Sequence, residues 1–255
     1  MRTPPGGAFS PMNLLALDTS TDILSIAVAR GDQRWLHSGA GGAQASSQLL
    51  PAVRALMAQA GLSFDALDAI VFGRGPGSFT GLRTACAIAQ GLAFAARNGQ
   101  GVPVLPVDTL MAVAEEARTQ HGHTQILACL DARMDEVYSA AYAYDGGQWA
   151  ALADLQVCPP QDVQVPGDFV VAGNAHAVYS DRLAPAALHV HAMPTASALL
   201  NLAPALIAQN LAVAAQDALP LYIRNKVAKT TAEREAEKAA LAAQAVPTTQ
   251  AAPQA

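Results

Sequence analysis

The sequence predicts an α/β protein of two lobes, because one pattern of strands and turns occurs twice along its 255 residues. In each copy an apolar strand ends in an aspartate, Asp18 in the first and Asp131 in the second. A second strand and a glycine-containing turn follow each aspartate, as in a β-hairpin. A later strand in each copy ends in glycine, at Gly73 and at Gly173. The offset of 113 residues between the aspartates exceeds a solenoid period and indicates two similar half-domains, with chance similarity as the alternative.

The first lobe is predicted over residues 12–107, where two helices accompany the hairpin strands. Residues 46–60 carry an apolar arc of roughly 120° at helical spacing. A buried strand over residues 69–72 then leads through a glycine-rich turn into a long helix that begins at Phe79. The members of the apolar arc are Leu49, Leu50, Val53, Leu56, Met57 and Ala60.

The second lobe is predicted over residues 108–225, with its hairpin strands near residues 126–151. Two helices are expected beside these strands, near residues 109–119 and 195–209. Pro204 falls within the second of them. Proline lacks the amide that a helix interior uses, so we expect a kink or a break at this position.

Both ends of the chain differ in composition from the two lobes. Residues 1–11 contain two prolines followed by two glycines and are predicted to be a disordered extension. Residues 226–255 are rich in Ala, Glu, Lys and Gln and end in a Gln/Ala/Pro tail. This tail is predicted to be a frayed helix or disordered.

The turn after residues 69–72 has the features of an anion-binding site. Its glycines, within residues 73–77, permit a close backbone approach, and Ser78 is placed to cap the helix that follows. Unpaired amides at such a helix N-terminus favour bound anions. The run lacks the Lys-Ser or Lys-Thr of a Walker loop, and it lacks the Rossmann spacing. A tight turn whose glycines serve only packing is therefore the alternative.

Paired hairpins that end in aspartate, with a glycine turn after a later strand, are typical of the actin, Hsp70 and sugar-kinase fold, which is ribonuclease H-like. In that fold the two aspartates face nucleotide phosphates and a hydrated Mg²⁺, which keeps its waters and needs only one or two carboxylates. Weak binding of ATP or ADP is left open here, and no other cofactor is predicted. The residues of the expected degenerate nucleotide cleft are Asp18, Thr19, Ser20, Gly75, Pro76, Gly77, Ser78, Asp131 and Gly173.

The chain resembles the TsaB family (also called YeaZ) in the segments LLALDTST, GRGPGSFTGLRTACAIAQGLAFA, LPVDTLMAVA, LACLDARMDEVYSAAY and PLYIRN. These segments occur in order from about residue 13 to residue 225. The resemblance implies a two-lobed subunit that does not catalyse alone. It implies pairing with the related catalytic subunit TsaD, together with the ATPase TsaE. These proteins threonylcarbamoylate the adenosine 3′ of the anticodon in tRNAs that read codons beginning with A.

The same resemblance separates this chain from a catalytic subunit. In the TsaD family, a helix after the corresponding strand carries a His-x-x-x-His metal pair, and the two positions here hold Thr109 and Val113. Neither side chain replaces histidine at such a metal site. We therefore expect no catalytic residue, no bound metal and no enzyme activity from the isolated chain. An active phospho- or acyltransferase of the same fold is the alternative, and a metallopeptidase is a weaker one.

Small side chains recur at spacings of three and four along one side of the long helix after Ser78. Small residues allow close helix packing, so this stripe and part of the preceding helix are predicted to form a partner-binding face. One face could serve both a homodimer and the heterodimer with the catalytic relative. An internal core is the alternative. The predicted interface residues are Leu50, Val53, Met57, Thr80, Thr84, Ala87 and Gly91.

Composition limits the other functions of the chain. Charged residues make up 14% and hydrophobic residues 52%, which predicts either a partner-covered surface or a large apolar core. With a net charge of −5 and no Lys/Arg cluster, we expect tRNA to be bound mainly through the complex. Three cysteines and the absence of a signal sequence fit a reduced cytoplasm. No apolar run reaches the length of about 20 residues that a membrane span needs.

Overall fold

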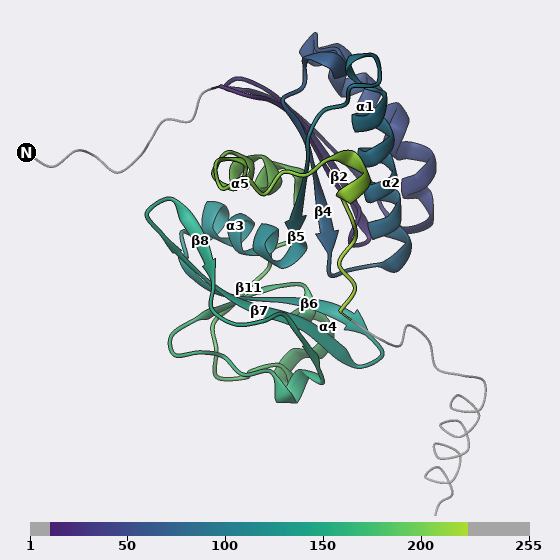
Figure 1. Ribbon diagram of the computed structural model, residues 1–255. Helices are drawn as coiled ribbons and strands as arrows, with labels where there is room; N and C mark the ends of the chain where they lie inside the picture. The colour runs from purple at the N-terminus through teal and green to yellow at the C-terminus, as the bar shows by residue number, and fades with distance from the viewer. Residues whose placement is uncertain (1–10, 224–255) are drawn as a thin grey trace, which may run out of the picture. The chain divides into compact units, whose positions relative to one another are not determined.

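The computed structural model describes residues 11–223, which contain two β-sheets and the helices packed against them (Figure 1). The first sheet has the strand order β3-β2-β1-β4-β5. Its strands are β1 (Asn13–Asp18), β2 (Ile23–Arg30), β3 (Gln33–Ala40), β4 (Ala69–Gly75) and β5 (Val104–Asp108). The second sheet has the order β11-β10-β6-β7-β8, and β9 also pairs with β7. Its strands are β6 (Gln125–Arg133), β7 (Glu136–Asp145), β8 (Gln148–Ala151), β9 (Gln156–Cys158), β10 (Val170–Gly173) and β11 (His189–Val190).

The two sheets share one topology, which confirms the predicted repeat. β1 pairs antiparallel with β2 and parallel with β4, and β6 pairs in the same way with β7 and β10. A third strand, β3 or β8, extends each hairpin on one side. A last parallel strand, β5 or β11, lies at the opposite edge. Asp18 and Asp131 therefore lie near the carboxyl ends of equivalent strands in a two-lobed α/β fold.

Helices α1 (Ala45–Ala60) and α2 (Phe79–Ala95) lie close to their predicted bounds and cover one face of the first sheet (Figure 1). The apolar arc of α1 faces this sheet, and Gly61 ends the helix in the left-handed conformation that glycine adopts most readily. The core between sheet and helices includes Leu15, Ile26, Leu49, Val53, Phe72 and Ala89. The short helix α4 (Ala175–Tyr179), which was not predicted from the sequence, follows β10.

Helices α3 (Thr109–His121) and α5 (Ala196–Ala208) pack against each other, and each covers the sheet of the other half (Figure 1). α3 follows the first sheet in the chain, but its buried residues Leu110, Val113 and Ala117 join the core of the second. α5 follows the second sheet and packs against β1, β2 and β4 of the first. This exchange joins residues 11–223 into one compact unit.

The exchange corrects the predicted lobe boundaries. The division into residues 12–107 and 108–225 assigned α5 and the segment after it to the second lobe, and this is wrong. The buried face of α5 shares a core with Leu14 and Val71 of the first sheet. Further along, Val213 pairs with Val104 of β5. Hydrophobic periodicity shows which face of a helix is buried, but not which sheet buries it.

Of the predicted kink or break at Pro204, the break is wrong, because α5 continues through this residue to Ala208, and the kink stays a prediction. An internal proline costs a helix about 3 kcal/mol. Burial of Leu199, Leu200 and Leu202 outweighs this, since each buried leucine contributes about 1.5–3 kcal/mol. The predicted disordered ends, residues 1–11 and 226–255, lie outside the described residues except for Pro11. Within residues 11–223, no helix has the length and apolar character needed to cross a membrane.

Candidate functional site

Asp18, at the end of β1, is completely buried. Its Oδ1 accepts hydrogen bonds from the Ser20 amide (3.0 Å) and from the Ser20 hydroxyl (2.7 Å). Its Oδ2 has no hydrogen-bond partner among the residues that the structure describes. Burial raises the pKa of Asp18 to about 6, although the two bonds from Ser20 oppose the rise. The carboxylate is thus held in an environment that disfavours its charge.

The glycine-rich turn closes directly over the segment that contains Asp18. A Cβ atom on Gly73 would overlap Oδ2 of Asp18, and one on Gly77 would overlap the Ser20 carbonyl. The first turn of α2 is as close, because a Cβ on Gly81 would overlap the Thr19 carbonyl. These glycines are therefore required by packing within the chain, which was the alternative interpretation of the turn.

Two amides of the predicted anion site already bond within the protein. The amide of Gly75 donates to the Thr109 hydroxyl (3.1 Å), and the amide of Ser78 donates to the Ser20 carbonyl (2.7 Å). Ser78 occupies the predicted N-cap position of α2, where its carbonyl accepts the Leu82 amide (2.9 Å), but its side chain makes no capping hydrogen bond. The structure brings the predicted residues 18–20 and 75–78 together, with fewer donors directed at a ligand than expected.

Asp131, the equivalent residue of the second half, has a different environment. Its Oδ1 accepts hydrogen bonds from the Tyr179 hydroxyl (2.7 Å) and the Arg133 amide (2.8 Å). Its Oδ2 lies 3.2 Å from the Arg133 guanidinium. Burial, and then the bond to Asp131, raise the pKa of Tyr179 above its ordinary value. Gly173 again serves packing, because a Cβ there would overlap the Cys129 carbonyl.

These residues do not fit a magnesium–nucleotide complex of the kind that the fold implies. The unbonded oxygen of Asp18 is closed off by Gly73, and the carboxylate of Asp131 is committed to Arg133 and Tyr179. Over residues 11–223, no cluster of three or more His, Cys, Asp or Glu side chains is placed to hold a metal ion. The observed geometry of Asp18 and Asp131 therefore does not support binding of Mg²⁺ together with a nucleotide at this site.

Thr109 and Val113 lie in the first turns of α3, and both are completely buried. The Thr109 hydroxyl accepts the bond from Gly75, and Val113 packs in the core of the second sheet. Thr109 and Val113, at the positions of the histidine pair in the TsaD family, thus stabilise the fold through a hydrogen bond and through core packing.

The predicted interface needs one correction. Val53 and Met57 are buried in the core of the first sheet and are not available to a partner. The wide apolar arc of α1 turns its centre toward the sheet, so only Leu50 on its flank is partly exposed. On α2, the predicted stripe of small residues lies on the surface. Thr80, Ala87 and Gly91 are exposed, and Thr84 is partly exposed.

The two glycines inside α2 have different surroundings. Gly81 is buried against Thr19, whereas a Cβ on Gly91 would meet no atom within 4 Å. A glycine in a helix interior costs up to about 1 kcal/mol relative to alanine. Packing within the chain explains why residue 81 is glycine, but it does not explain the glycine at position 91.

An aromatic cluster, which was not predicted from the sequence, extends the exposed face at the start of α2. The Arg83 guanidinium lies 3.8 Å from the centre of the Phe79 ring, and its Nε donates to the Tyr222 hydroxyl (3.0 Å). The rings of Phe79 and Tyr222 lie 5.3 Å apart. Both rings remain exposed, at 38% and 45%. The only signal was the segment PLYIRN, whose position beside α2 depends on the tertiary fold.

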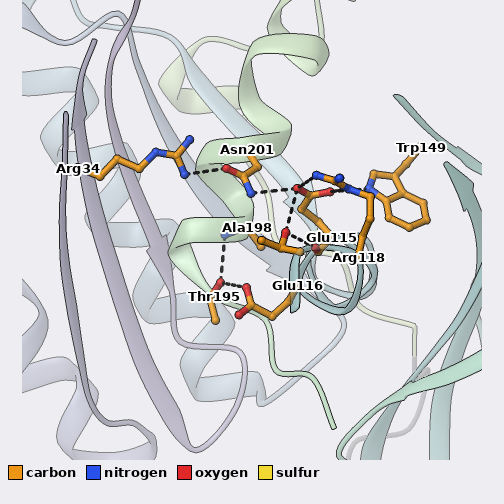
Figure 2. A network of polar contacts seen from close by, with 9 residues as sticks. Arg34, Glu115, Glu116, Arg118, Trp149, Thr195, Ala198 and Asn201 are labelled. Atoms are coloured by element: carbon orange, nitrogen blue, oxygen red, sulfur yellow. Dashed lines mark hydrogen bonds and ion pairs between the residues drawn. The ribbon is translucent and has the colours of Figure 1, made fainter. Parts of the chain in front are cut away.

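A second polar network, also not predicted, joins α3, α5 and β8 (Figure 2). The buried carboxylate of Glu115 accepts two hydrogen bonds from Arg118, at 2.9 and 2.8 Å. It also accepts one from Trp149 Nε1 (3.0 Å) and one from Asn201 Nδ2 (2.9 Å). Burial alone would raise the pKa of Glu115, but the bonds and charge of Arg118 and the bond from Trp149 lower it below its ordinary value.

Comparison with known proteins agrees with this architecture. The family model described as TsaD, tRNA N6-adenosine threonylcarbamoyltransferase, matches residues 33–252. The tRNA threonylcarbamoyladenosine biosynthesis protein TsaB of Escherichia coli K12 is 34% identical, over 85% of this chain and 96% of that protein. The chain belongs to the TsaB family. The TsaB protein of Haemophilus influenzae is 36% identical, over 85% of this chain and 95% of its own length.

Solved structures extend the similarity of this TsaB-family chain to its fold. YeaZ from Pseudomonas aeruginosa superposes with a TM-score of 0.77 and is 38% identical, over 83% of this chain and all of that one. A second structure from that organism, described as similar to peptidase YeaZ, has a TM-score of 0.77 and is 40% identical, over 84% of this chain.

Proposed function

We propose that the chain is the non-catalytic scaffold and dimerisation subunit for threonylcarbamoyladenosine synthesis on tRNA. It acts with a TsaD-type catalytic paralogue and a TsaE-type ATPase on the adenosine 3′ of the anticodon, in tRNAs that read codons beginning with A. Membership of the TsaB family supports this, because the relatives from Escherichia coli and Haemophilus influenzae are named as biosynthesis proteins for this nucleoside.

The observation that carries the non-catalytic role is the buried pair Thr109 and Val113 at the start of α3. By the resemblance described above, the TsaD family has two histidines at these positions. Here one side chain supports the glycine turn and the other packs in an apolar core. Neither is a metal ligand, so α3 contributes to stability rather than to catalysis.

Partner binding is assigned to the exposed face of α2 with Leu50 of α1. Its small residues permit another helix to approach closely, and the unexplained Gly91 lies in the middle of this face. The same face serves either a homodimer or the heterodimer, so the two assemblies compete. With a net charge of −5, the chain reaches tRNA through the complex, in the cytoplasm.

An active transferase of the same fold is the alternative function. It is favoured by Asp18, because a carboxyl group with a pKa near 6 suits a general base. The complete burial of Asp18 opposes it, since no substrate atom reaches the side chain without opening the turn. We expect any binding of ATP with Mg²⁺ to be weak. A dissociation constant near about 1 μM by calorimetry would favour the alternative.

Reconstitution tests the proposed role. The purified chain, given threonylcarbamoyl-adenylate and tRNA, is expected to form no modified nucleoside. Adding the TsaD-type paralogue and the TsaE-type ATPase should restore turnover, and omitting this chain should abolish it. Turnover by the chain alone would refute the non-catalytic role. Full turnover by the paralogue and ATPase without this chain would refute the requirement for it.

A further inference from the structure

A hollow of about 290 Å³ lies beside the Glu115 network, away from the glycine turn. Its walls come from both halves: β3 and α5 on one side, and α3 with the β7–β8 hairpin on the other. Figure 2 shows that Arg34 contacts Asn201, which in turn contacts Glu115, whereas Arg118 and Trp149 contact Glu115 from the other side. Small-molecule sites have volumes from about 300 Å³ upward, so this hollow is close to the smallest of them.

The lining of the hollow has an excess of positive charge. Its only acidic residue is Glu115, whose carboxylate is fully engaged by Arg118, Trp149 and Asn201. The charge of Glu115 balances that of Arg118 and leaves the charge of Arg34 uncompensated within the lining.

Both guanidinium groups keep donors for a ligand. Arg34 uses Nη1 to donate to Asn201 (2.7 Å), and Arg118 uses Nε and Nη2 on Glu115. Within residues 11–223, no acceptor bonds to Nη2 of Arg34 or to Nη1 of Arg118. A planar fork of N–H donors matches the two oxygens of a carboxylate.

The remaining walls suit an apolar or planar body. The Arg118 guanidinium lies 4.4 Å from the centre of the Tyr144 ring, and Trp149 contacts the same ring edge-on at 5.1 Å. α5 contributes Leu206 and Ala205 on the opposite side, and α3 contributes Met111. Apolar walls with a few polar groups that converge are typical of small-molecule sites.

We propose that this hollow binds a small organic anion with one carboxylate on an aromatic or aliphatic body. The carboxylate pairs with the free donors of Arg34, and the body lies between Tyr144 and α5. The single uncompensated charge favours a monoanion over a polyphosphate, and it disfavours a cation. Binding here is independent of the partner interface on α2, so it can be tested on the purified chain without a partner.

The probe is indole-3-propionate, compared with its amide and with the corresponding amine by ligand-observed NMR and calorimetry. The carboxylate is expected to bind with a dissociation constant of about 1 mM or tighter, and the amide at least about tenfold more weakly. The amine should show no saturable binding. Absence of saturation by the carboxylate up to about 10 mM, or equal affinity for the amide, would overturn the proposal.

Variants locate the site. Arg34→Gln, at an exposed position, should weaken carboxylate binding about tenfold, and Arg34→Lys less. Arg54→Gln removes an exposed arginine from α1 outside the hollow and should leave binding unchanged. Ala205→Leu fills the hollow without changing its charge and should also weaken carboxylate binding. This variant provides the test if Arg34→Gln proves unstable. Unchanged affinity in a folded Arg34→Gln or Ala205→Leu chain would refute this location.

Discussion

Replacing Asp18 with asparagine tests the buried carboxylate at the centre of the expected nucleotide cleft. The amide oxygen can still accept the two bonds from Ser20, while the group can no longer ionise. The pKa of Asp18 rises from 3.8 to about 6 on folding, chiefly through burial. At about 1.4 kcal/mol per pH unit, ionisation of Asp18 costs the folded state about 3 kcal/mol at neutral pH.

The direction of this effect follows from the raised pKa. The folded chain holds the Asp18 proton more tightly than the unfolded chain, so this group favours folding most below pH 3.8. Its contribution is lost as the pH rises from 3.8 to about 6. Asparagine does not titrate. The stability of Asp18→Asn relative to the wild type should therefore increase by about 2.4 kcal/mol between about pH 4 and pH 7.

Urea denaturation, followed by tryptophan fluorescence, measures this difference at each pH. Comparing the variant with the wild type cancels the titration of all other groups. Asp32→Asn, an exposed residue after β2, controls for the loss of one negative charge. A difference that stays constant within about 0.5 kcal/mol across the range would refute the assigned environment of Asp18. A difference of opposite sign would show a stabilised carboxylate, as a bound cation produces.

Three further predictions concern α2 and α3. Gly81→Ala should destabilise the chain by about 1–3 kcal/mol in thermal unfolding, because its Cβ overlaps the Thr19 carbonyl. Gly91→Ala should stabilise the isolated chain by up to about 1 kcal/mol, because helix propensity rises and the added methyl meets nothing. Glu115→Gln should cost about 3 kcal/mol in urea unfolding, since it breaks a buried ion pair whose partner Arg118 is part-exposed.

Each of these predictions has an internal control. The two glycine variants add the same methyl group to the same helix, so equal effects would contradict the assigned surroundings. For Glu115→Gln, the matched change is Asp135→Asn, which breaks the exposed pair with Arg182 and should cost much less. Because the pKa of Glu115 is lowered, the effect of Glu115→Gln should also shrink as the pH falls below 4.5. If the stability lost in Glu115→Gln did not depend on pH, the ion pair with Arg118 could not be the source of that stability.

Much of the fold could be predicted from local patterns. The strand that ends in Asp18 and the strand that ends near Asp131 carry the repeat, and alternation with turn residues identifies the hairpins after them. The helical spacing of apolar residues in α1 gives its bounds to within a residue. These features depend on neighbouring residues, which is why the sequence alone suffices.

The remaining features depend on contacts between distant segments. Periodicity identified the apolar face of α5 but not the first sheet that covers it. It included Val53 and Met57 in an interface, because an arc of 120° does not show which part faces the sheet. The glycine turn suggested an anion site, whereas the close approach to Asp18 and Ser20 explains its glycines by packing. The Glu115 network joins α3, α5 and β8, and Asn201 extends it to Arg34 of β3; only the tertiary fold brings these elements together.

Gly91→Trp most directly tests the claim that the chain works by pairing through α2. The change places a large side chain on an exposed face, so the isolated chain should keep its fold and its melting temperature. Ala177→Trp adds the same bulk to an exposed position on α4, away from this face.

The measurement is the affinity of each variant for the TsaD-type paralogue, by sedimentation or calorimetry. Gly91→Trp should lose at least about tenfold in affinity, which corresponds to about 1.4 kcal/mol, and should lose homodimer formation together with it. Ala177→Trp should pair like the wild type. A folded Gly91→Trp chain that binds the paralogue with unchanged affinity would contradict the account and move the interface elsewhere.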